Sequence, residues 1–320
     1  MYLYLDVVEN FACEMCGTCC RNDWMITVDE ESYYRNARWF KERGCSEEFS
    51  QALLPLSKRG FGEYAYIAKQ SDGSCWFLDP TNLCRLHREA GHDQLDAVCK
   101  TFPRYPMNTS RGVELTLSFS CPAVLKKMTR VEPLAIVRSE HLPWQETQRD
   151  YAAEAFPDQH SRYHPLHYYF ELESHFFDII QCRAMVMDER LDFLAASVNK
   201  VLQIPKDDFF GRSLRCMMEE NYLLMDEKTC LRQTKYCTPE ILIEHFLANF
   251  IFKKPFYNYG LQKTIELLLL MWQEIEEARK KAVTFTDDMG ITGKIIMNME
   301  FQYNHNRRQL LESFHNGREK

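Results

Sequence analysis

The chain has 320 residues, and its 39 lysines and arginines against 46 aspartates and glutamates give a formal net charge of −7. This length is enough for two domains with ordinary hydrophobic cores, so the fold does not need disulfides for stability. The acidic balance, with no lysine- or arginine-rich run, counts against nucleic acid as a partner, because neutralising phosphates requires a basic face.

Two stretches of the sequence bear on the compartment. The N-terminal "MYLYLDVVEN" lacks the basic segment, the apolar run and the cleavage site of a signal peptide, so we expect a cytoplasmic protein. The run "LLLLMW" at 267–272 is far too short to span a bilayer, so we expect no membrane partner. In a reducing cytoplasm, the 13 cysteines indicate metal ligation rather than disulfides.

In chain order, the first element is a cysteine run, "FACEMCGTCC" at 11–20, with four thiols in eight positions. Residues 29–43 begin with acidic residues and are followed by a glycine, Gly44, which predicts a helix. The stretches "GEYAYIAK" and "RGVELTLSF" alternate apolar and polar residues and predict short strands. Between and after them lie the remaining cysteine motifs, "CWFLDPTNLCRLHR", "CKTFPRYP" and "SFSCPAV".

The second half of the chain differs in pattern. Residues 129–163 are polar and broken by prolines, which favours a linker. From 164 onward the pattern is helical, and apolar residues spaced four and three apart over 261–275 predict one buried helix face. The fold class is therefore mainly α with a small α+β cysteine-cluster region: an N-terminal metal-cluster domain (1–128), the linker (129–163) and a helical domain (164–320).

Eight cysteines lie in local motifs within the first 121 residues, next to Pro, Gly or Asn, where loops can direct sulfur inward. We predict that the metal ligands are Cys13, Cys16, Cys19, Cys20, Cys75, Cys84, Cys99 and Cys121. The other five have no partner at ligand spacing and are expected to be small buried apolar residues. They are Cys45, Cys182, Cys216, Cys230 and Cys237.

The spacing bears on the identity of the metal. A C-x2-C-x2-C run with a further cysteine before proline, here Cys121-Pro122, resembles the ligand pattern of bacterial iron-sulfur clusters, although the last cysteine is distant. Adjacent residues such as Cys19 and Cys20 point in different directions, so both rarely serve one ion. One [4Fe-4S] cluster, a cluster with a zinc, or two metal sites all remain possible, and the spacing favours iron-sulfur over zinc. Alternatively, the metal could have a purely structural role and hold this region of the chain together.

The order of these motifs resembles the cysteine region of the flagellin lysine-N-methylase family, within the wider CxxCxxCC-type zinc- or iron-chelating cysteine-cluster family. Seven thiols, from Cys13 to Cys99, match the order of the wider family, and Cys121 in "SCPA" matches the methylase branch. A softer resemblance lies in "IEHFLANFIFKKPF" and "YNHNRRQLLESF".

The resemblance implies methyl transfer to lysine side chains of flagellin, with S-adenosylmethionine as donor and an iron-sulfur cluster required. The sequence does not locate the donor site, since its Gly-x-Gly at Gly60 and Gly62 is better explained as a hairpin turn. Two other functions stay open. The chain could bind or deliver iron or zinc without catalysis, or helices 165–320 could bind a partner while a metal only shapes the N-terminal half.

A lysine methylase must remove a proton from an amine whose ordinary pKa is about 10.4. A carboxylate, tyrosine or histidine in a poorly solvated pocket could accept it. Our candidates for the catalytic role are Tyr105, His87 and His305. The wider set of residues that could contribute adds Asp79, Asp96, Arg104, Glu244 and His245, several of which also have ordinary structural explanations, such as a turn at Asp79-Pro80.

Overall fold

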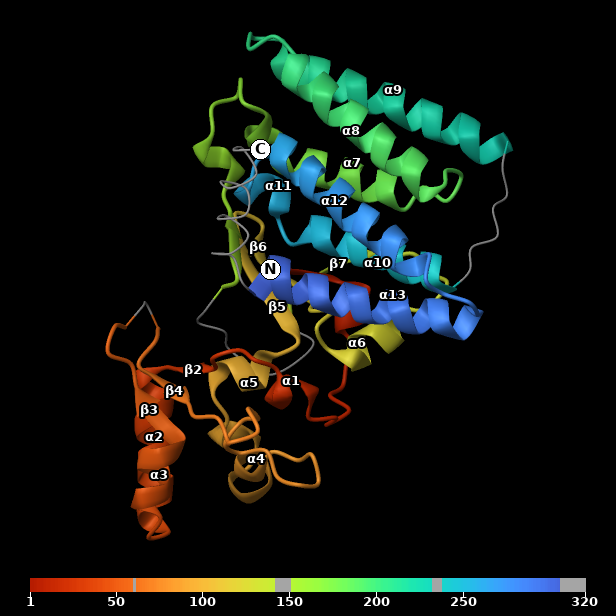
Figure 1. The fold of residues 1–320 in the computed structure, drawn as a ribbon. Helices are drawn as coiled ribbons and strands as arrows, with labels where there is room; N and C mark the ends of the chain where they lie inside the picture. The colour runs from red at the N-terminus through yellow and green to blue at the C-terminus, as the bar shows by residue number, and fades with distance from the viewer. Residues whose placement is uncertain (60–61, 142–150, 232–237, 306–320) are drawn as a thin grey trace, which may run out of the picture.

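The computed structural model describes residues 1–59, 62–141, 151–231 and 238–305 (Figure 1). The fold is mainly helical with two small sheets, as the sequence predicted in outline. Its apolar side chains form two separate cores. We call the part built on the larger core the body, and the part over residues 18–101 the small lobe. The two parts lie at opposite ends of the view in Figure 1.

The body contains a five-stranded sheet in the order β7-β1-β6-β5-β8. β1 runs parallel to β6 and antiparallel to β7, β5 and β6 form an antiparallel hairpin, and β8 lies parallel to β5. The strands are β1 Tyr2–Leu5, β5 Arg104–Thr109, β6 Gly112–Leu117, β7 Ile136–Ser139 and β8 Ala153–Ala155. β6 is the strand expected from "RGVELTLSF". Both β7 and β8 lie within the expected linker 129–163, and the domain boundaries themselves stay a prediction.

Helices that follow β6 along the chain cover the sheet. They are α6 Pro122–Lys127, α7 Tyr169–Ile180, α8 Met187–Gln203, α9 Phe210–Leu231, α10 Thr238–Phe252, α11 Pro255–Asn258, α12 Leu261–Arg279 and α13 Phe285–Glu300, followed by the π-helix η5 Phe301–His305. Short 3-10 turns complete the body, namely η1 Asp6–Val8, η3 Pro157–Gln159 and η4 Pro165–Tyr168. None of the described helices is both long enough and apolar enough to cross a bilayer.

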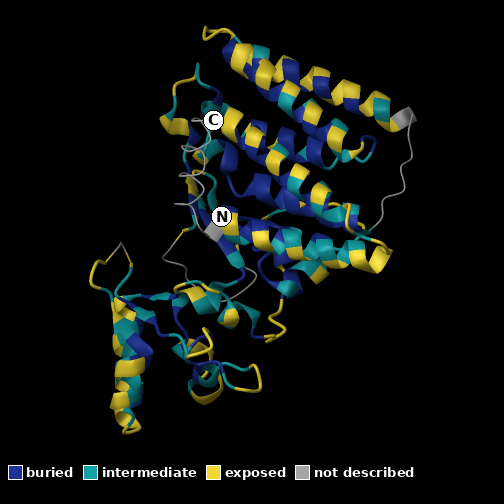
Figure 2. Ribbon diagram, in the orientation of Figure 1, coloured by how far each residue is buried: buried dark blue, intermediate teal, exposed yellow. Residues whose placement is uncertain are grey.

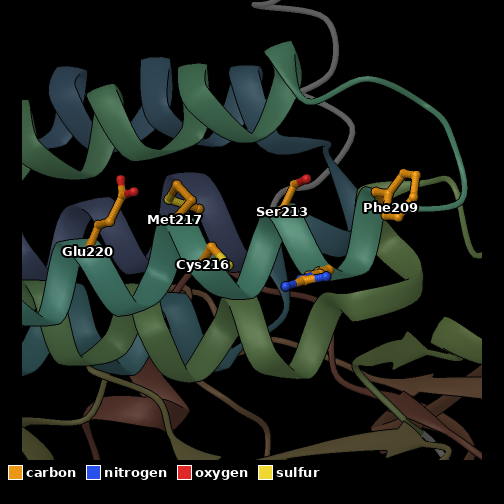
Figure 3. A pocket seen from close by; sticks show the side chains of 6 residues that line it. Phe209, Ser213, Cys216, Met217 and Glu220 are labelled. Carbon is orange, nitrogen blue, oxygen red and sulfur yellow. The ribbon is translucent and has the colours of Figure 1, made fainter.

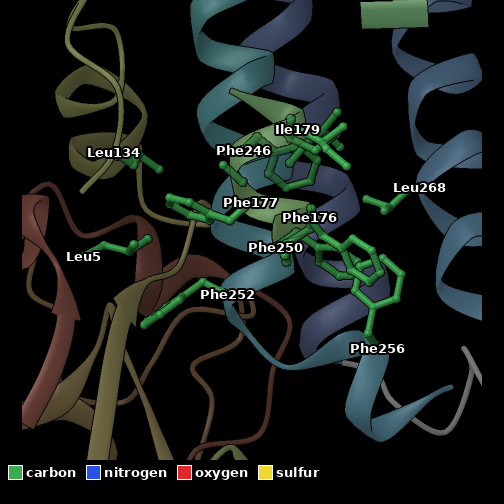
Figure 4. Close-up of a cluster of buried hydrophobic side chains, with 14 of the residues drawn as sticks. Leu5, Leu134, Phe176, Phe177, Ile179, Phe246, Phe250, Phe252, Phe256 and Leu268 are labelled. Atoms are coloured by element: carbon green, nitrogen blue, oxygen red, sulfur yellow. The ribbon is translucent and has the colours of Figure 1, made fainter. Parts of the chain in front are cut away.

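α10 is the central helix of the body because its sequence, "ILIEHFLANFIF", is apolar on every side. Every residue from Ile241 to Phe252 is buried, and Figure 2 shows this helix dark blue among its neighbours. Figure 4 shows Phe250 of α10 beside Phe176 of α7 and Phe256 of α11. The ring centres of Phe176 and Phe256 lie 4.7 Å apart. The predicted apolar face of 261–275 is buried in α12, which confirms its role in core packing.

The small lobe consists of a sheet in the order β2-β4-β3 and short helices. Its elements are α1 Thr18–Arg21, β2 Thr27–Val28, α2 Glu30–Glu42, α3 Ser46–Ala52, β3 Leu53–Pro55, β4 Ala65–Ile67, α4 Arg85–Ala90, η2 His92–Gln94 and α5 Ala97–Thr101. α2 confirms the predicted helix: Asp29 caps its start by accepting a hydrogen bond from the Ser32 N–H at 2.8 Å, and Gly44 follows its end at a φ of 71°.

A buried ion network joins the sheet to the helices. The Lys254 Nζ lies 2.5 Å from a Glu173 oxygen of α7 and 2.9 Å from a Glu114 oxygen of β6, and it donates to the Phe252 carbonyl at 2.7 Å. Arg111, in the β5–β6 turn, contacts both carboxylates at 2.8 Å. Two cations and two anions therefore balance one another, as buried charges require.

Candidate functional site

The loop before α1 has a backbone shaped by its sequence. Met15 and Gly17 both have positive φ, at 50° and 71°, and the Met15 N–H donates to the Cys13 sulfur at 3.3 Å. Backbone turns that alternate into the left-handed region direct N–H groups into a concavity that binds anions, including those of iron-sulfur sites. The positive φ of Gly17 favours glycine here, and a Cβ would also lie 3.3 Å from the Asn82 carbonyl oxygen, which is a tight contact.

Five of the eight predicted ligands come together in the small lobe. α1 carries Cys19 and Cys20, and the Cys75 N–H donates to the Cys20 carbonyl at 2.7 Å, which holds the second motif against the first. Isolated β-bridges place Cys75 opposite Lys69 and Cys84 opposite Leu78. Cys84 directly precedes α4 and Cys99 lies in α5, so four separate elements direct thiols toward one region.

The pKa values of these five thiols show how they interact. The Cys19 and Cys20 sulfurs lie 3.9 Å apart, and a hydrogen bond from Cys20 lowers the pKa of Cys19 to about 7. A second hydrogen bond from Cys20 lowers the pKa of Cys75. The pKa of Cys20 itself is raised, because its thiol donates to both Cys19 and Cys75. Burial raises the pKa of Cys84 and of Cys99, and the charges of Cys75 and Cys19 add to both shifts.

The other three predicted ligands form a second group at the edge of the body. Cys121 is buried and immediately precedes α6, which starts with a proline. Burial raises the pKa of Cys121 to about 11, and the charges of Cys16 and Cys13 contribute to the rise, which places these two exposed thiols near it. The compact run of four cysteines is thus divided, with Cys19 and Cys20 in the lobe group and Cys13 and Cys16 in the Cys121 group.

The chemistry of the lobe group fits a thiolate-bound metal. All eleven cysteines whose side chains are described are free thiols. The 3.9 Å separation of two sulfurs is close to the edge of a tetrahedral site, about 3.8 Å when each metal–sulfur bond is about 2.3 Å. As the side chains stand, however, no three His, Cys, Asp or Glu residues of the described ranges converge closely enough to hold one metal ion. The thiol donors of the lobe group therefore fit a metal site by type, but their side chains must change rotamer before they can bind one ion.

A buried carboxylate, Asp96, lies beside the lobe group. Asp96 is 1% exposed, and neither of its carboxylate oxygens has a hydrogen-bond partner among the described residues. Burial raises its pKa to about 7, and its charge contributes to the raised pKa of Cys99. The positive charge of Arg35 opposes the rise in the Asp96 pKa, so the charged form of the acid is only partly compensated at its buried position.

A second polar cluster, which we call the junction cluster, lies just before Cys121. Ser118 donates to Glu300 of α13 at 2.8 Å and lies 2.8 Å from the Ser120 hydroxyl, and all three residues are buried. Lys253 pairs with Glu300 and lies 4.8 Å from the ring centre of Tyr105. The sequence analysis named Tyr105 as a candidate but missed its partners. The sequence signal that could have identified Ser118 and Ser120 is their position in "SFS", directly before Cys121.

Three other candidates, two in the lobe and Arg104 in β5 of the body, make structural contacts. Asp79 accepts hydrogen bonds from the Thr81 and Leu83 N–H groups, and the Thr81 hydroxyl is the main cause of lowering its pKa to about 2, which confirms the turn. The His87 ring packs against the His92 ring, and the backbone N–H of His87 donates a hydrogen bond to the Cys84 thiol. Arg104 donates to the Phe11 carbonyl at 3.3 Å.

The candidates of the helical region are buried inside the body. The Glu244 carboxylate accepts hydrogen bonds from Arg183 and Arg190, so its charge is already neutralised. His245 contacts the Met128 carbonyl at the end of α6 opposite Cys121, and burial lowers its pKa. For His305 only the backbone, at the end of η5, is described. The structure therefore does not bring Glu244 or His245 together with the thiols.

The remaining cysteines correct one expectation. Cys45 and Cys182 are half-buried and Cys216 is exposed, so the expectation of buried packing is wrong for Cys216. The side chain of Cys230 and all of Cys237 lie outside the described residues, as do the glycine-turn residues 60–61. Cys216 and Met217, both labelled in Figure 3, line a shallow hollow of about 460 Å³ along α9. Figure 1 shows α9 at the end of the body away from the small lobe.

Comparison with known proteins gives partial matches. Residues of the chain are 28% identical to proteins named Lysine-N-methylase from Salmonella choleraesuis (strain SC-B67) and Salmonella typhimurium (strain LT2), over 145 and 146 residues. Each match covers 44% of this chain and 35% of the relative. A match to Flagellar biosynthetic protein FliU of Salmonella muenchen is 27% identical over 124 residues, which is 38% of this chain and 72% of the relative.

The chain thus spans about a third of the length of the two relatives named Lysine-N-methylase. No family model matches the sequence. No solved structure matches it either.

Proposed function

We propose that the chain is a protein lysine N-methyltransferase that acts on flagellin with S-adenosylmethionine as methyl donor. The observation that carries the proposal is the order of eight cysteines, which resembles that of the flagellin lysine-N-methylase family and folds into two neighbouring thiol groups. The partial similarity to proteins named Lysine-N-methylase and to a protein with a flagellar name supports the same conclusion.

A thiolate-bound metal is part of this proposal. Four of the five lobe thiols would hold a [4Fe-4S] cluster, or zinc as the alternative, and would leave Cys13, Cys16 and Cys121 for a second site. Bound there, an iron-sulfur cluster would supply a redox-active centre, whereas zinc would hold the motifs together. The division of the thiols into two groups supports two sites over a single one.

Methyl transfer from a sulfonium to a lysine forms a nitrogen–carbon bond, breaks a carbon–sulfur bond, and releases a thioether and one proton. The amine must lose that proton before it attacks, so a poorly solvated proton acceptor is required. Of the candidates, Tyr105 lies in the junction cluster with Lys253 and Glu300, and His87 lies beside Cys84. We propose Tyr105 as the first residue to test, because it is buried and therefore meets the solvation requirement.

The experiment uses anaerobically purified, metal-loaded protein with S-adenosylmethionine and flagellin, and measures methyl addition to lysines by mass spectrometry. We expect transfer by the wild type, none by Cys75→Ser, and unchanged transfer by Cys182→Ser, a matched control outside the thiol groups. Tight binding of S-adenosylmethionine without turnover would indicate a different protein substrate. Failure to bind it at all would contradict the methyltransferase proposal.

The second candidate function is iron or zinc binding without catalysis, and the exposure of Cys13 and Cys16 favours it. Exposed thiolates exchange metal readily with a partner, whereas a purely structural site is closed. Transfer of metal to a chelator within minutes, lost in Cys16→Ser, would support this function over methyl transfer.

A further inference from the structure

An aromatic cluster on the small lobe lies apart from both thiol groups. Tyr33 and Tyr34 of α2 pack with Phe49 of α3 and with Tyr64, which directly precedes β4, at ring-centre distances of 4.9–5.6 Å. The Tyr34 and Tyr64 hydroxyls lie 2.9 Å apart. Tyr34 is 52% exposed and the other three rings are half-buried, so the cluster borders solvent. Figure 1 shows α2 and α3 along one edge of the lobe.

The backbone fixes the position of Tyr64. Its N–H donates to the Val28 carbonyl at 2.9 Å, and its own carbonyl accepts a hydrogen bond from the Leu56 N–H at 3.0 Å, which continues the pairing of the small sheet. Together with the contact between the two hydroxyls, these bonds hold the ring rigidly. A preorganised ring loses little conformational freedom when a ligand packs on it.

A cation already lies on this ring. The guanidinium of Arg59, an exposed residue after β3, lies 3.8 Å from the centre of the Tyr64 ring. The charges of Glu30 and Arg59 both act on the Tyr34 hydroxyl, so a carboxylate is also near the cluster. An aromatic face with a nearby negative charge attracts cations, and Arg59 shows that the Tyr64 face can be reached by one.

We propose that the Tyr33, Tyr34, Phe49 and Tyr64 cluster is a binding site for a lysine side chain of a polypeptide, with a preference for the methylated form, and that Arg59 occupies it until the ligand displaces it. The preference follows from hydrogen bonding. The two hydroxyls are engaged with each other, so the face offers few acceptors, and a methylated ammonium has fewer N–H groups to satisfy than a guanidinium or a free ammonium.

The chemistry of the ligand is inferred from the cluster itself, while its biological meaning rests on the proposed function, whose product would be a methylated lysine. The site would then retain a modified flagellin chain while further lysines are presented. Binding can be measured without a methyl donor or a metal, so failure of this proposal and failure of the methyltransferase proposal are distinguishable.

The test titrates N-acetyl-Nε-trimethyl-lysine amide into the full chain and follows the N-methyl proton resonance by NMR, since a ring face shifts these protons upfield. The control ligand is the neutral isostere in which carbon replaces the charged nitrogen. We expect Arg59→Ala to strengthen binding about two- to fivefold, because it removes a competing exposed cation–π contact, and Tyr64→Leu to abolish the upfield shift. Arg43→Ala is the matched control, since Arg43 lies over Trp39 at 4.0 Å in the same lobe.

Two results would overturn the proposal. Equal binding of the neutral isostere would show that charge is not recognised, and unchanged or weaker binding by Arg59→Ala would show that Arg59 does not occupy the site. Because Arg59 is exposed, its replacement does not endanger folding, so the Arg59→Ala arm decides the question even if Tyr64→Leu unfolds the lobe.

Discussion

Replacing Lys254 with methionine tests whether the buried ion network holds the sheet to the helices. The ammonium is fully buried and lies within 3 Å of both Glu114 and Glu173, whose side chains are at most 1% exposed. Methionine has a similar length and the same backbone requirement at the φ of 68°, so the change removes mainly the charge. Two carboxylates would then face Arg111 alone. Removing one partner of a buried ion pair costs about 3–5 kcal/mol, which we expect in urea unfolding followed by circular dichroism at pH 7.

The same network predicts a rescue and a pH dependence. Adding Glu173→Gln to Lys254→Met restores one anion to one cation, so we expect it to recover more than half of the loss. Burial already raises the pKa of Glu173, and losing Lys254 raises it further. A carboxyl group with a raised pKa in the folded state stabilises the native protein while it is protonated at low pH, and this stabilisation is lost as the pH rises through that pKa. The loss of stability caused by Lys254→Met should therefore be smaller at pH 5 than at pH 7. A loss below about 1 kcal/mol, or no recovery in the double variant, would refute the reasoning.

Three further predictions concern single sites. Gly17→Ala should lower stability by about 1–3 kcal/mol and reduce metal content, because a side chain disfavours the positive φ. Gly290→Ala, in open space within α13, should instead raise stability by about 0.5–1 kcal/mol, and equal effects of the two changes on the urea midpoint would contradict this. Burial raises the pKa of Asp96 to about 7, so metal-stripped protein should lose about 1.4 kcal/mol of stability per pH unit from this group between roughly pH 4 and pH 7. Asp96→Asn should therefore be more stable than the wild type at pH 8. A gain in stability seen only at pH 5 would exclude this explanation. Cys99→Ser should lose metal and visible absorbance while Cys182→Ser keeps both; metal loss in the second variant would show that the thiol groups are drawn wrongly.

Elements with local signals were predictable from the sequence. The helix at 29–43 has its capping residue, its acidic first turn and its terminal glycine within one short stretch, and α2 follows these signals closely. β4 and β6 follow period-2 alternation. β7 and β8 were missed because they are short strands in a polar, proline-containing segment, and their pairing with β1 and β5 depends on residues far away in the sequence.

The candidate site was predictable in its residue types and not in its grouping. Spacing identified the cysteines, but it suggested that Cys13, Cys16 and Cys19 act together. The positive φ of Gly17 turns the chain between Cys16 and Cys19, so the later thiol joins the small lobe while the earlier two stay near Cys121. The junction cluster was missed because Ser118 and Glu300 are 182 positions apart and are joined only by tertiary packing.

The parallel pairing of β1 with β6 has a consequence for how the chain folds. Tyr2 pairs with Val113, so roughly 110 residues, including the whole small lobe, must be made before β1 can find its central partner. Closing a loop of that length costs about 4 kcal/mol of chain entropy, which slows the formation of such long-range contacts. The small lobe, whose core uses only residues between Ile26 and Leu95, can collapse during that interval and bring the two ends of the loop closer together. During synthesis the lobe would therefore fold ahead of the sheet and act as the step that speeds the closure of the body.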